Sequence, residues 1–148
     1  MKDYSNSVPR FELVKVQTNF PCIKVNTSEL ASSFIRQFYS DDIHIFESFF
    51  VLLVNNSNET IGFAKISQGG ITSTIVDCRL VAHYAVQSLA VGIIIAHNHP
   101  SGNCQPSEAD KQITKKLKEG LRLLDITILD HIILTGASYY SFSDNGIL

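Results

Sequence analysis

The chain has 148 residues, of which 45% are hydrophobic and 18% are charged, and its formal net charge is −2. This length suits one domain with a sizeable buried core, and the composition excludes a disordered or fibrous protein. The slightly negative charge gives the chain no overall attraction to nucleic acid or to an anionic membrane.

No apolar run approaches the roughly 18 residues that a membrane-spanning helix needs, and residues 1–7 lack the apolar centre of a signal peptide. The chain has three cysteines at wide spacing, an odd number that argues against a disulfide framework. We therefore expect a cytoplasmic protein with reduced thiols and no membrane partner. The sequence does not indicate an oligomeric state.

The first half of the chain predicts one helix and three strands after an N-terminal segment. Residues 1–25 mix polar with short alternating apolar stretches and contain two prolines, which indicates an extended arm or an edge strand. A capping pattern followed by apolar residues at helical spacing predicts a helix over 26–39. Apolar, β-rich runs predict a hairpin with strands over 47–54 and 60–66, and alternation predicts a third strand over 71–76.

The second half predicts alternating helices and strands. An amphipathic helix is expected over 79–90, and a short, uncharged, β-branched run predicts a buried strand over 91–96. A longer amphipathic helix over 107–124 follows, and two closing strands are expected over 127–134 and 139–142. The chain has no internal repeat and no linker. The sum is a mixed α/β (α+β) domain in which helices flank a central sheet.

Two histidines stand at the end of the buried strand. His97 and His99 are separated by one residue, so the two-residue period of a strand directs both imidazoles to the same side. The helix that begins near Ser107 places the carboxylate of Asp110 in its first turn, from which it can fold back toward the histidines. The pattern therefore predicts three metal ligands at a rigid corner between strand, loop and helix.

Three protein ligands are typical of a catalytic zinc ion (Zn²⁺), whose fourth position is left to water, whereas a structural site is closed by four ligands. No cysteine pair with zinc-finger spacing accompanies the histidines. We therefore expect an open, hydrolytic site. Zinc lowers the pKa of a bound water to about 7, and a nearby carboxylate must take the water's proton.

Ser107 and Asp110 also have a purely structural interpretation. A serine followed three residues later by an acidic residue is a helix-capping pattern, with Ser107 as the N-cap and Asp110 closing a capping box. The two interpretations are compatible, because a helix start needs a cap whatever else its side chains do.

The spaced pattern His97-x-His99-Pro100, then Ser107 and Asp110, resembles the JAMM motif of the JAB/MPN-plus metalloproteases. The stretches His-Asn-His-Pro-Ser-Gly at 97–102 and Leu-Asp-His-Ile-Ile at 129–133 resemble the RadC-like branch of that family more closely. The likeness covers roughly residues 26–148. It implies a curved mixed sheet between helices, similar in layout to cytidine deaminases.

The resemblance also implies roles for single residues. His97, His99 and Asp110 would bind zinc, Ser107 would help to hold the oxyanion or the activated water, and an upstream glutamate would be the general base. Glu47 matches the family's glutamate, which opens a strand and is followed by an aromatic residue and a pair of leucines. Glu59, in the hairpin turn, is the alternative. These roles imply a zinc-dependent hydrolase that cleaves a peptide or isopeptide bond in a peptide or protein substrate.

Other interpretations stay open. RadC-like proteins carry a DNA-repair label, so the chain is alternatively a nucleic-acid-binding module that uses Lys111, Lys115 and Lys118, with the metal site in an accessory or structural role. A third alternative is an interaction scaffold with a dormant site. The sequence also leaves open whether three further residues near the motifs contribute to the site, namely Cys104, Asp130 and His131.

Overall fold

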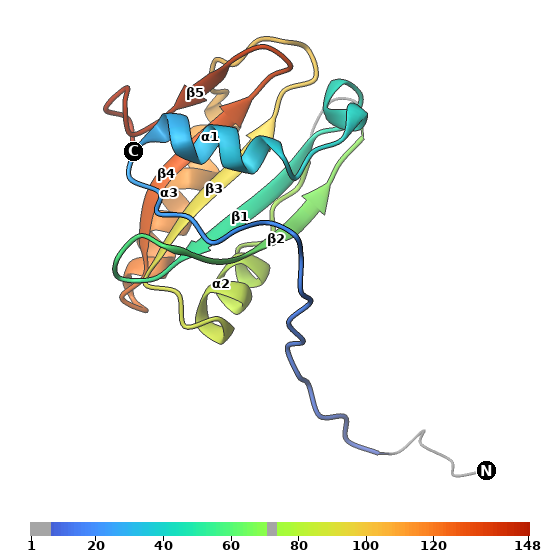
Figure 1. Cartoon of the computed structure of the whole chain (residues 1–148), viewed down its shortest axis with the longest axis vertical. Coiled ribbons are helices and arrows are strands. Elements are labelled where there is room, and N and C mark those ends of the chain that lie inside the picture. Colours follow the sequence, from blue (N-terminus) through green and yellow to red (C-terminus); the bar gives the residue numbers. More distant parts are fainter. Residues whose placement is uncertain (1–6, 71–73) are drawn as a thin grey trace, which may run out of the picture.

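The computed structural model describes residues 7–70 and 74–148 (Figure 1). Within these residues the elements follow one another as α1 (Ser28–Arg36), a short 3-10 helix (Asp41–His44), β1 (Ser48–Val54), β2 (Thr60–Gln68), α2 (Cys78–Gln87), β3 (Gly92–Asn98), α3 (Glu108–Arg122), β4 (Thr127–Leu134) and β5 (Tyr139–Ser141). None of the described helices is both long and apolar enough to cross a bilayer.

The strands form one five-stranded sheet in the order β2-β1-β3-β4-β5. Only β3 and β4 run parallel, and the other neighbours are antiparallel. Every residue of β1 and of β3 is buried, which explains their apolar runs over 49–54 and 92–96, since both faces of a covered central strand need apolar side chains. The predicted mixed α/β class is confirmed.

Helices cover both faces of the sheet (Figure 1). On one face α1 packs through Phe34 and Ile35 against side chains such as Leu52 and Ile94. On the other face α2 and α3 pack against the alternate side chains of the same strands. The sheet is therefore the middle layer between two hydrophobic cores, and a residue's parity along β1 or β3 decides which core it enters.

The first helix is shorter than its sequence predicts. Its N-cap is Thr27, whose side chain accepts the Leu30 N–H, but it ends at Arg36 rather than near Tyr39. The Phe38 ring stacks on Phe63 of β2 with centroids 3.9 Å apart. These residues therefore leave the helix to pack onto the sheet.

The N-terminal segment is an extended arm over its described residues. Residues 7–18 form no helix or strand, and Figure 1 shows them running away from the body of the molecule. Closer to α1 the segment joins the fold, because Lys24 forms an isolated bridge with Glu59 and the Phe20 ring packs edge-on against Phe34 and Phe63.

The third strand predicted over 71–76 is wrong where it can be compared. Residues 71–73 lie outside the described residues, and 74–76 adopt no strand. The Thr74 hydroxyl donates to the Ser67 hydroxyl at 2.8 Å, so this segment contacts the end of β2 through a side chain rather than through strand pairing. Alternating Thr, Ser and aliphatic residues have strand propensity, but a strand also needs a neighbouring backbone to pair with.

Candidate metal centre

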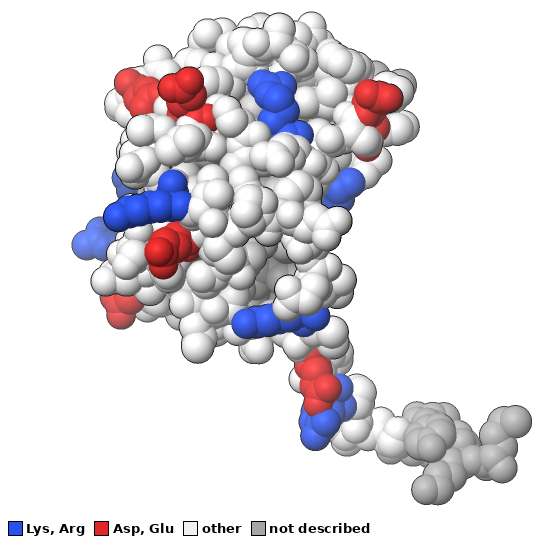
Figure 2. All heavy atoms as spheres, viewed as in Figure 1, with Lys and Arg blue, Asp and Glu red and all other residues white. Residues whose placement is uncertain are grey.

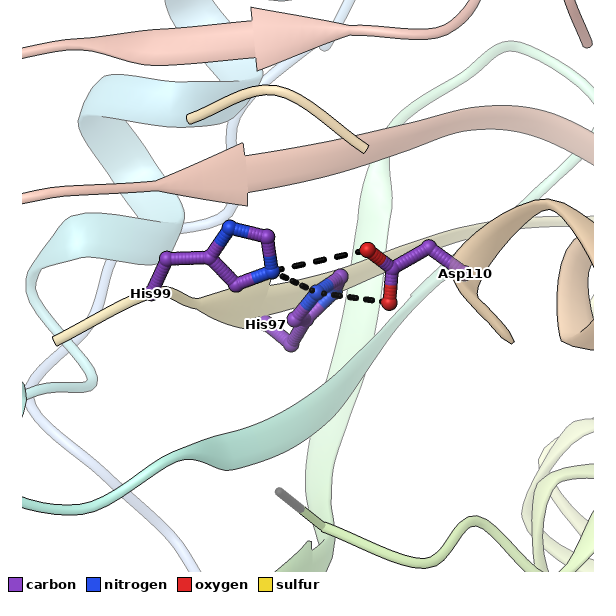
Figure 3. A group of neighbouring side chains, drawn as sticks. All are labelled: His97, His99 and Asp110. Atoms are coloured by element: carbon purple, nitrogen blue, oxygen red, sulfur yellow. Dashed lines mark hydrogen bonds and ion pairs between the residues drawn. The ribbon is translucent and has the colours of Figure 1, made fainter. Parts of the chain in front are cut away.

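His97 lies near the C-terminal end of β3, between Phe49 of β1 and Ile133 of β4. His99 follows directly after the strand, and its backbone N–H donates to the Leu134 carbonyl at 2.8 Å, which extends the pairing with β4 by one step. The extended backbone therefore keeps the two-residue period, and both imidazoles emerge on the side of α3 (Figure 3).

Asp110 reaches the histidines from the first turn of α3 (Figure 3). Ser107 is the N-cap: its hydroxyl oxygen accepts the Asp110 N–H at 3.1 Å, and the Asp110 carboxylate accepts the Ser107 N–H at 2.7 Å. This capping box holds the carboxylate in place, while its other oxygen lies 3.1 Å from His97 Nε2. The capping interpretation of Ser107 and Asp110 is thus confirmed, and it positions the carboxylate beside the imidazoles.

The three side chains have the spacing that one metal ion requires. His97 Nε2 lies 3.0 Å from His99 Nε2, and Asp110 oxygens lie 3.1 Å from His97 Nε2 and 3.5 Å from His99 Nε2. Nitrogen and oxygen ligands of a tetrahedral zinc ion are about 3.4 Å apart. His97 is 1% exposed, whereas the side chain of His99 is 17% exposed, so the group opens to solvent on the side of His99.

The Nδ1 atoms of both histidines point away from this group, and each has a hydrogen-bond partner. His99 Nδ1 lies 2.7 Å from the Asn103 carbonyl oxygen, which can only accept, so Nδ1 carries a proton. In the neutral ring Nε2 then presents its lone pair. His97 Nδ1 lies 2.8 Å from Nε2 of the buried His131. A partner on the far nitrogen is the arrangement that orients metal-binding histidines.

The electrostatics favour a bound cation. Burial alone would raise the pKa of Asp110, but the hydrogen bonds from His97 and His99 hold that pKa far below its usual value. The same hydrogen bond to Asp110 raises the pKa of His99. The group His97, His99 and Asp110 therefore has the donor atoms, spacing and charge to hold a metal ion.

Comparison with known proteins agrees with this geometry. The family model of the RadC-like JAB domain matches residues 25–147. The chain belongs to the RadC-like JAB family. It is 48% identical over 124 residues to a UPF0758 protein of Flavobacterium johnsoniae, a match that covers 84% of this chain and 53% of the relative. It is 43% identical over 102 residues to the UPF0758 protein YfjY of Escherichia coli, covering 69% of this chain and 64% of the relative.

A further relative is a UPF0758 protein of Porphyromonas gingivalis, 44% identical over 103 residues that make up 69% of this chain and 45% of the relative. This RadC-like JAB domain spans about half the length of the curated relatives in Flavobacterium and Porphyromonas.

Glu47 directly precedes β1 in this RadC-like JAB domain, and the β1–β3 register brings it toward the metal-ligand group. Burial raises the pKa of Glu47, and the nearby His97 and His99 partly offset that rise. Glu59 lies in the turn at the opposite end of the β1–β2 hairpin, where its carboxylate accepts a hydrogen bond from Asn55 Nδ2 at 2.9 Å. Of the two predicted glutamates, the structure brings only Glu47 to the group.

Asn98 is a contributor that the sequence analysis missed. It lies between the two histidines but points to the opposite face, where it is fully buried. Its Oδ1 accepts the Ser48 N–H at 2.8 Å, and its Nδ2 donates to the Ile43 and Phe46 carbonyls at 2.7 and 2.8 Å. Asn98 thereby holds both flanks of Glu47. The two-residue period of β3 was the signal that could have found it.

The residues left open by the sequence have distinct positions. Cys104 is not part of the candidate ligand group among the described residues. His131 contacts His97, whereas Asp130 points away and accepts the backbone N–H groups of His131 and Ser143. Successive side chains of β4 point to opposite faces of the sheet, so of Asp130 and His131 only His131 touches the RadC-like site.

Proposed function

We propose that this RadC-like JAB domain is a zinc-dependent hydrolase that cleaves an amide bond, of the peptide or isopeptide type, in a peptide or protein substrate. The observation that carries the proposal is the cluster of His97, His99 and Asp110, which opens to solvent on one side. The two histidine Nε2 atoms lie 3.0 Å apart, and each faces one of the two Asp110 carboxylate oxygens, at 3.1 and 3.5 Å. Three ligands with an open fourth position are typical of a hydrolytic rather than a structural zinc site.

A zinc ion held by these residues would acidify a water molecule and polarise the substrate carbonyl. Glu47 would take the proton from that water, a task that suits a half-buried carboxyl whose pKa is raised by burial. It would then return the proton to the leaving amine. The Ser107 hydroxyl accepts its capping bond through a lone pair, so its proton can be donated to the developing oxyanion.

The nucleic-acid alternative receives less support from the charges of α3. Lys111 pairs with Glu108 at 2.8 Å, and Lys118 Nζ donates to the Leu148 carbonyl oxygen at 3.0 Å. Two of the three lysines named for nucleic-acid binding therefore already have partners within the chain. On the opposite face, which carries α1, Figure 2 shows basic and acidic side chains interspersed rather than gathered. A phosphate backbone binds best to a concentrated basic surface.

Metal analysis and turnover test the proposal together. Protein purified without chelator should contain stoichiometric zinc, and His97→Ala should lose it. Glu47→Gln should keep the zinc and lose about 10²–10⁴-fold in the rate of hydrolysis of a panel of fluorogenic peptide amides and isopeptides. Glu59→Gln is the matched control and should keep both properties. Absence of zinc from the wild type, or equal rates for Glu47→Gln and the wild type, would overturn the proposal.

A further inference from the structure

A buried polar chain lies behind the candidate metal ligands. His131 of β4 is fully buried, and its ring nitrogens face two partners: Nε2 lies 2.8 Å from His97 Nδ1, and Nδ1 lies 2.6 Å from the Thr114 hydroxyl of α3. Thr114 is 3% exposed. Neither residue belongs to the ligand group, yet the chain connects that group to the core of the molecule.

The donor and acceptor of each hydrogen bond in this row of side chains can be assigned by starting from the Asp110 backbone carbonyl. The Thr114 hydroxyl donates to the Asp110 backbone carbonyl at 2.6 Å, and a carbonyl can only accept. The hydroxyl proton is therefore committed, so the hydroxyl oxygen accepts from His131 Nδ1, which must carry a proton.

The surroundings of His131 favour its neutral form. The Phe142 ring stacks on the imidazole with centroids 4.5 Å apart, and Phe49 contacts it edge-on at 5.9 Å. Its two polar partners are a hydroxyl and another imidazole, neither of which supplies a negative charge. A neutral imidazole protonated on Nδ1 has a bare Nε2, so His97 Nδ1 is the donor in the bond between the two rings.

We propose that Thr114 and His131 are positioning residues that hold the proton of His97 on Nδ1 and so keep its Nε2 available to the metal. This inference rests on the proposed function. The chain begins at the backbone carbonyl of one ligand, Asp110, and ends at the ring of another, His97. It therefore couples the placement of α3 to that of β3. His99 is oriented independently, by the Asn103 carbonyl in the exposed loop.

Thr114→Val tests the chain because it removes the hydroxyl and nearly keeps the shape of the side chain. In metal-free wild type, long-range ¹H–¹⁵N correlation spectra should show His131 protonated on Nδ1. In Thr114→Val the His131 proton should be free to move to Nε2, and the affinity for zinc, measured by chelator competition, should fall about 10–100-fold. Thr114→Ser, which keeps the hydroxyl, should restore both the tautomer and the affinity.

Thr60→Val is the matched control. Thr60 is also buried, and its hydroxyl accepts the Ile23 N–H at 2.9 Å, but it lies at the other end of the sheet. This variant should lose a buried hydrogen bond without any change in zinc affinity.

Two results would overturn the inference: wild-type His131 protonated on Nε2, which needs no variant to fold, or wild-type zinc affinity in Thr114→Val. A wild type that binds no zinc would instead refute the proposed function, while the tautomer of His131 in the metal-free protein would still decide whether the chain exists.

Discussion

At the scale of single residues, the two ligand histidines use the same chemistry with different supports. Each presents Nε2 to the candidate metal position and has a partner on Nδ1, but that partner is a buried imidazole for His97 and an exposed loop carbonyl for His99. Asp110 likewise serves twice, since its carboxylate closes the capping box and faces both imidazoles. A substitution at any of these residues therefore changes both local structure and the site.

The raised pKa of His99 predicts that zinc binding releases protons in a pH-dependent way. Because the carboxylate of Asp110 raises this pKa, metal-free His99 keeps its proton to higher pH than a free histidine does. Zinc must displace that proton, so its apparent affinity should fall as the pH drops below the raised pKa and level off above it.

Calorimetric titrations in buffers of different ionisation enthalpy count these protons. We expect proton release per zinc to persist to higher pH than an unperturbed histidine, with its pKa near 6.5, would allow. Proton release that ends at the pH of an unperturbed histidine would contradict the coupling between His99 and Asp110.

At the scale of elements, strand parity distributes the functions of neighbouring residues. Along β3 the histidines point toward α3 and Asn98 points to the opposite side, where it holds the segment that carries Glu47. Along β4, His131 faces the site and Asp130 faces the turn after β5. One strand thus supports the metal-ligand group on one face and the surrounding fold on the other.

This division predicts that Asp130 matters for stability and not for metal binding. Asp130 is 5% exposed and accepts the backbone N–H groups of His131 and Ser143 at 2.7 and 2.9 Å. Asp130→Ala removes the acceptor of these two N–H groups and of the Ser141 hydroxyl, and it leaves the buried His131 N–H and Ser141 hydroxyl without this partner. The variant should lower the free energy of unfolding by about 3 kcal/mol, measured in urea. Asp130→Asn keeps an acceptor and should cost about 1 kcal/mol.

Both Asp130 variants should bind zinc with wild-type affinity. Equal destabilisation by alanine and asparagine would show that the charge of Asp130, rather than its acceptor geometry, supports the turn.

At the scale of the whole molecule, the ligand group joins parts of the fold that are otherwise separate. His97 belongs to β3 in the sheet, His99 to the loop that follows, and Asp110 to α3 in the helical layer. A metal ion bound by all three links the layers, and because the unfolded chain does not bring these ligands together, binding stabilises the folded state.

Zinc should therefore raise the melting temperature of the wild type. At a free concentration of about 100 times the dissociation constant, binding contributes about 2.7 kcal/mol, which corresponds to about 5 °C or more for a domain of this size. Differential scanning calorimetry measures the shift. His99→Ala removes the most exposed of the three ligands and should show little or no rise, whereas an equal rise in this variant would place the bound zinc elsewhere.

Local sequence signals predicted most of the fold. The apolar runs of β1 and β3 and the amphipathic pattern and cap of α3 are properties of short segments, so they can be recognised without a structure. The strand expected over 71–76 illustrates the limit, because 74–76 have the propensity but no pairing partner. The early end of α1 has a similar cause, since Phe38 packs on Phe63 of a strand about 25 residues away.

The candidate site divides in the same way. The sequence by itself determined that His97, His99 and Asp110 are potential ligands on one corner, because the strand period and the helix cap that bring them together act within 14 residues. Only the tertiary structure decided that Glu47 rather than Glu59 approaches them. It also decided that Asn98 binds the backbone on both sides of Glu47, and that His131 contacts His97 on one side and Thr114 on the other. Those contacts depend on the register of β1 and β4 against β3 and on the docking of α3, which no local pattern specifies.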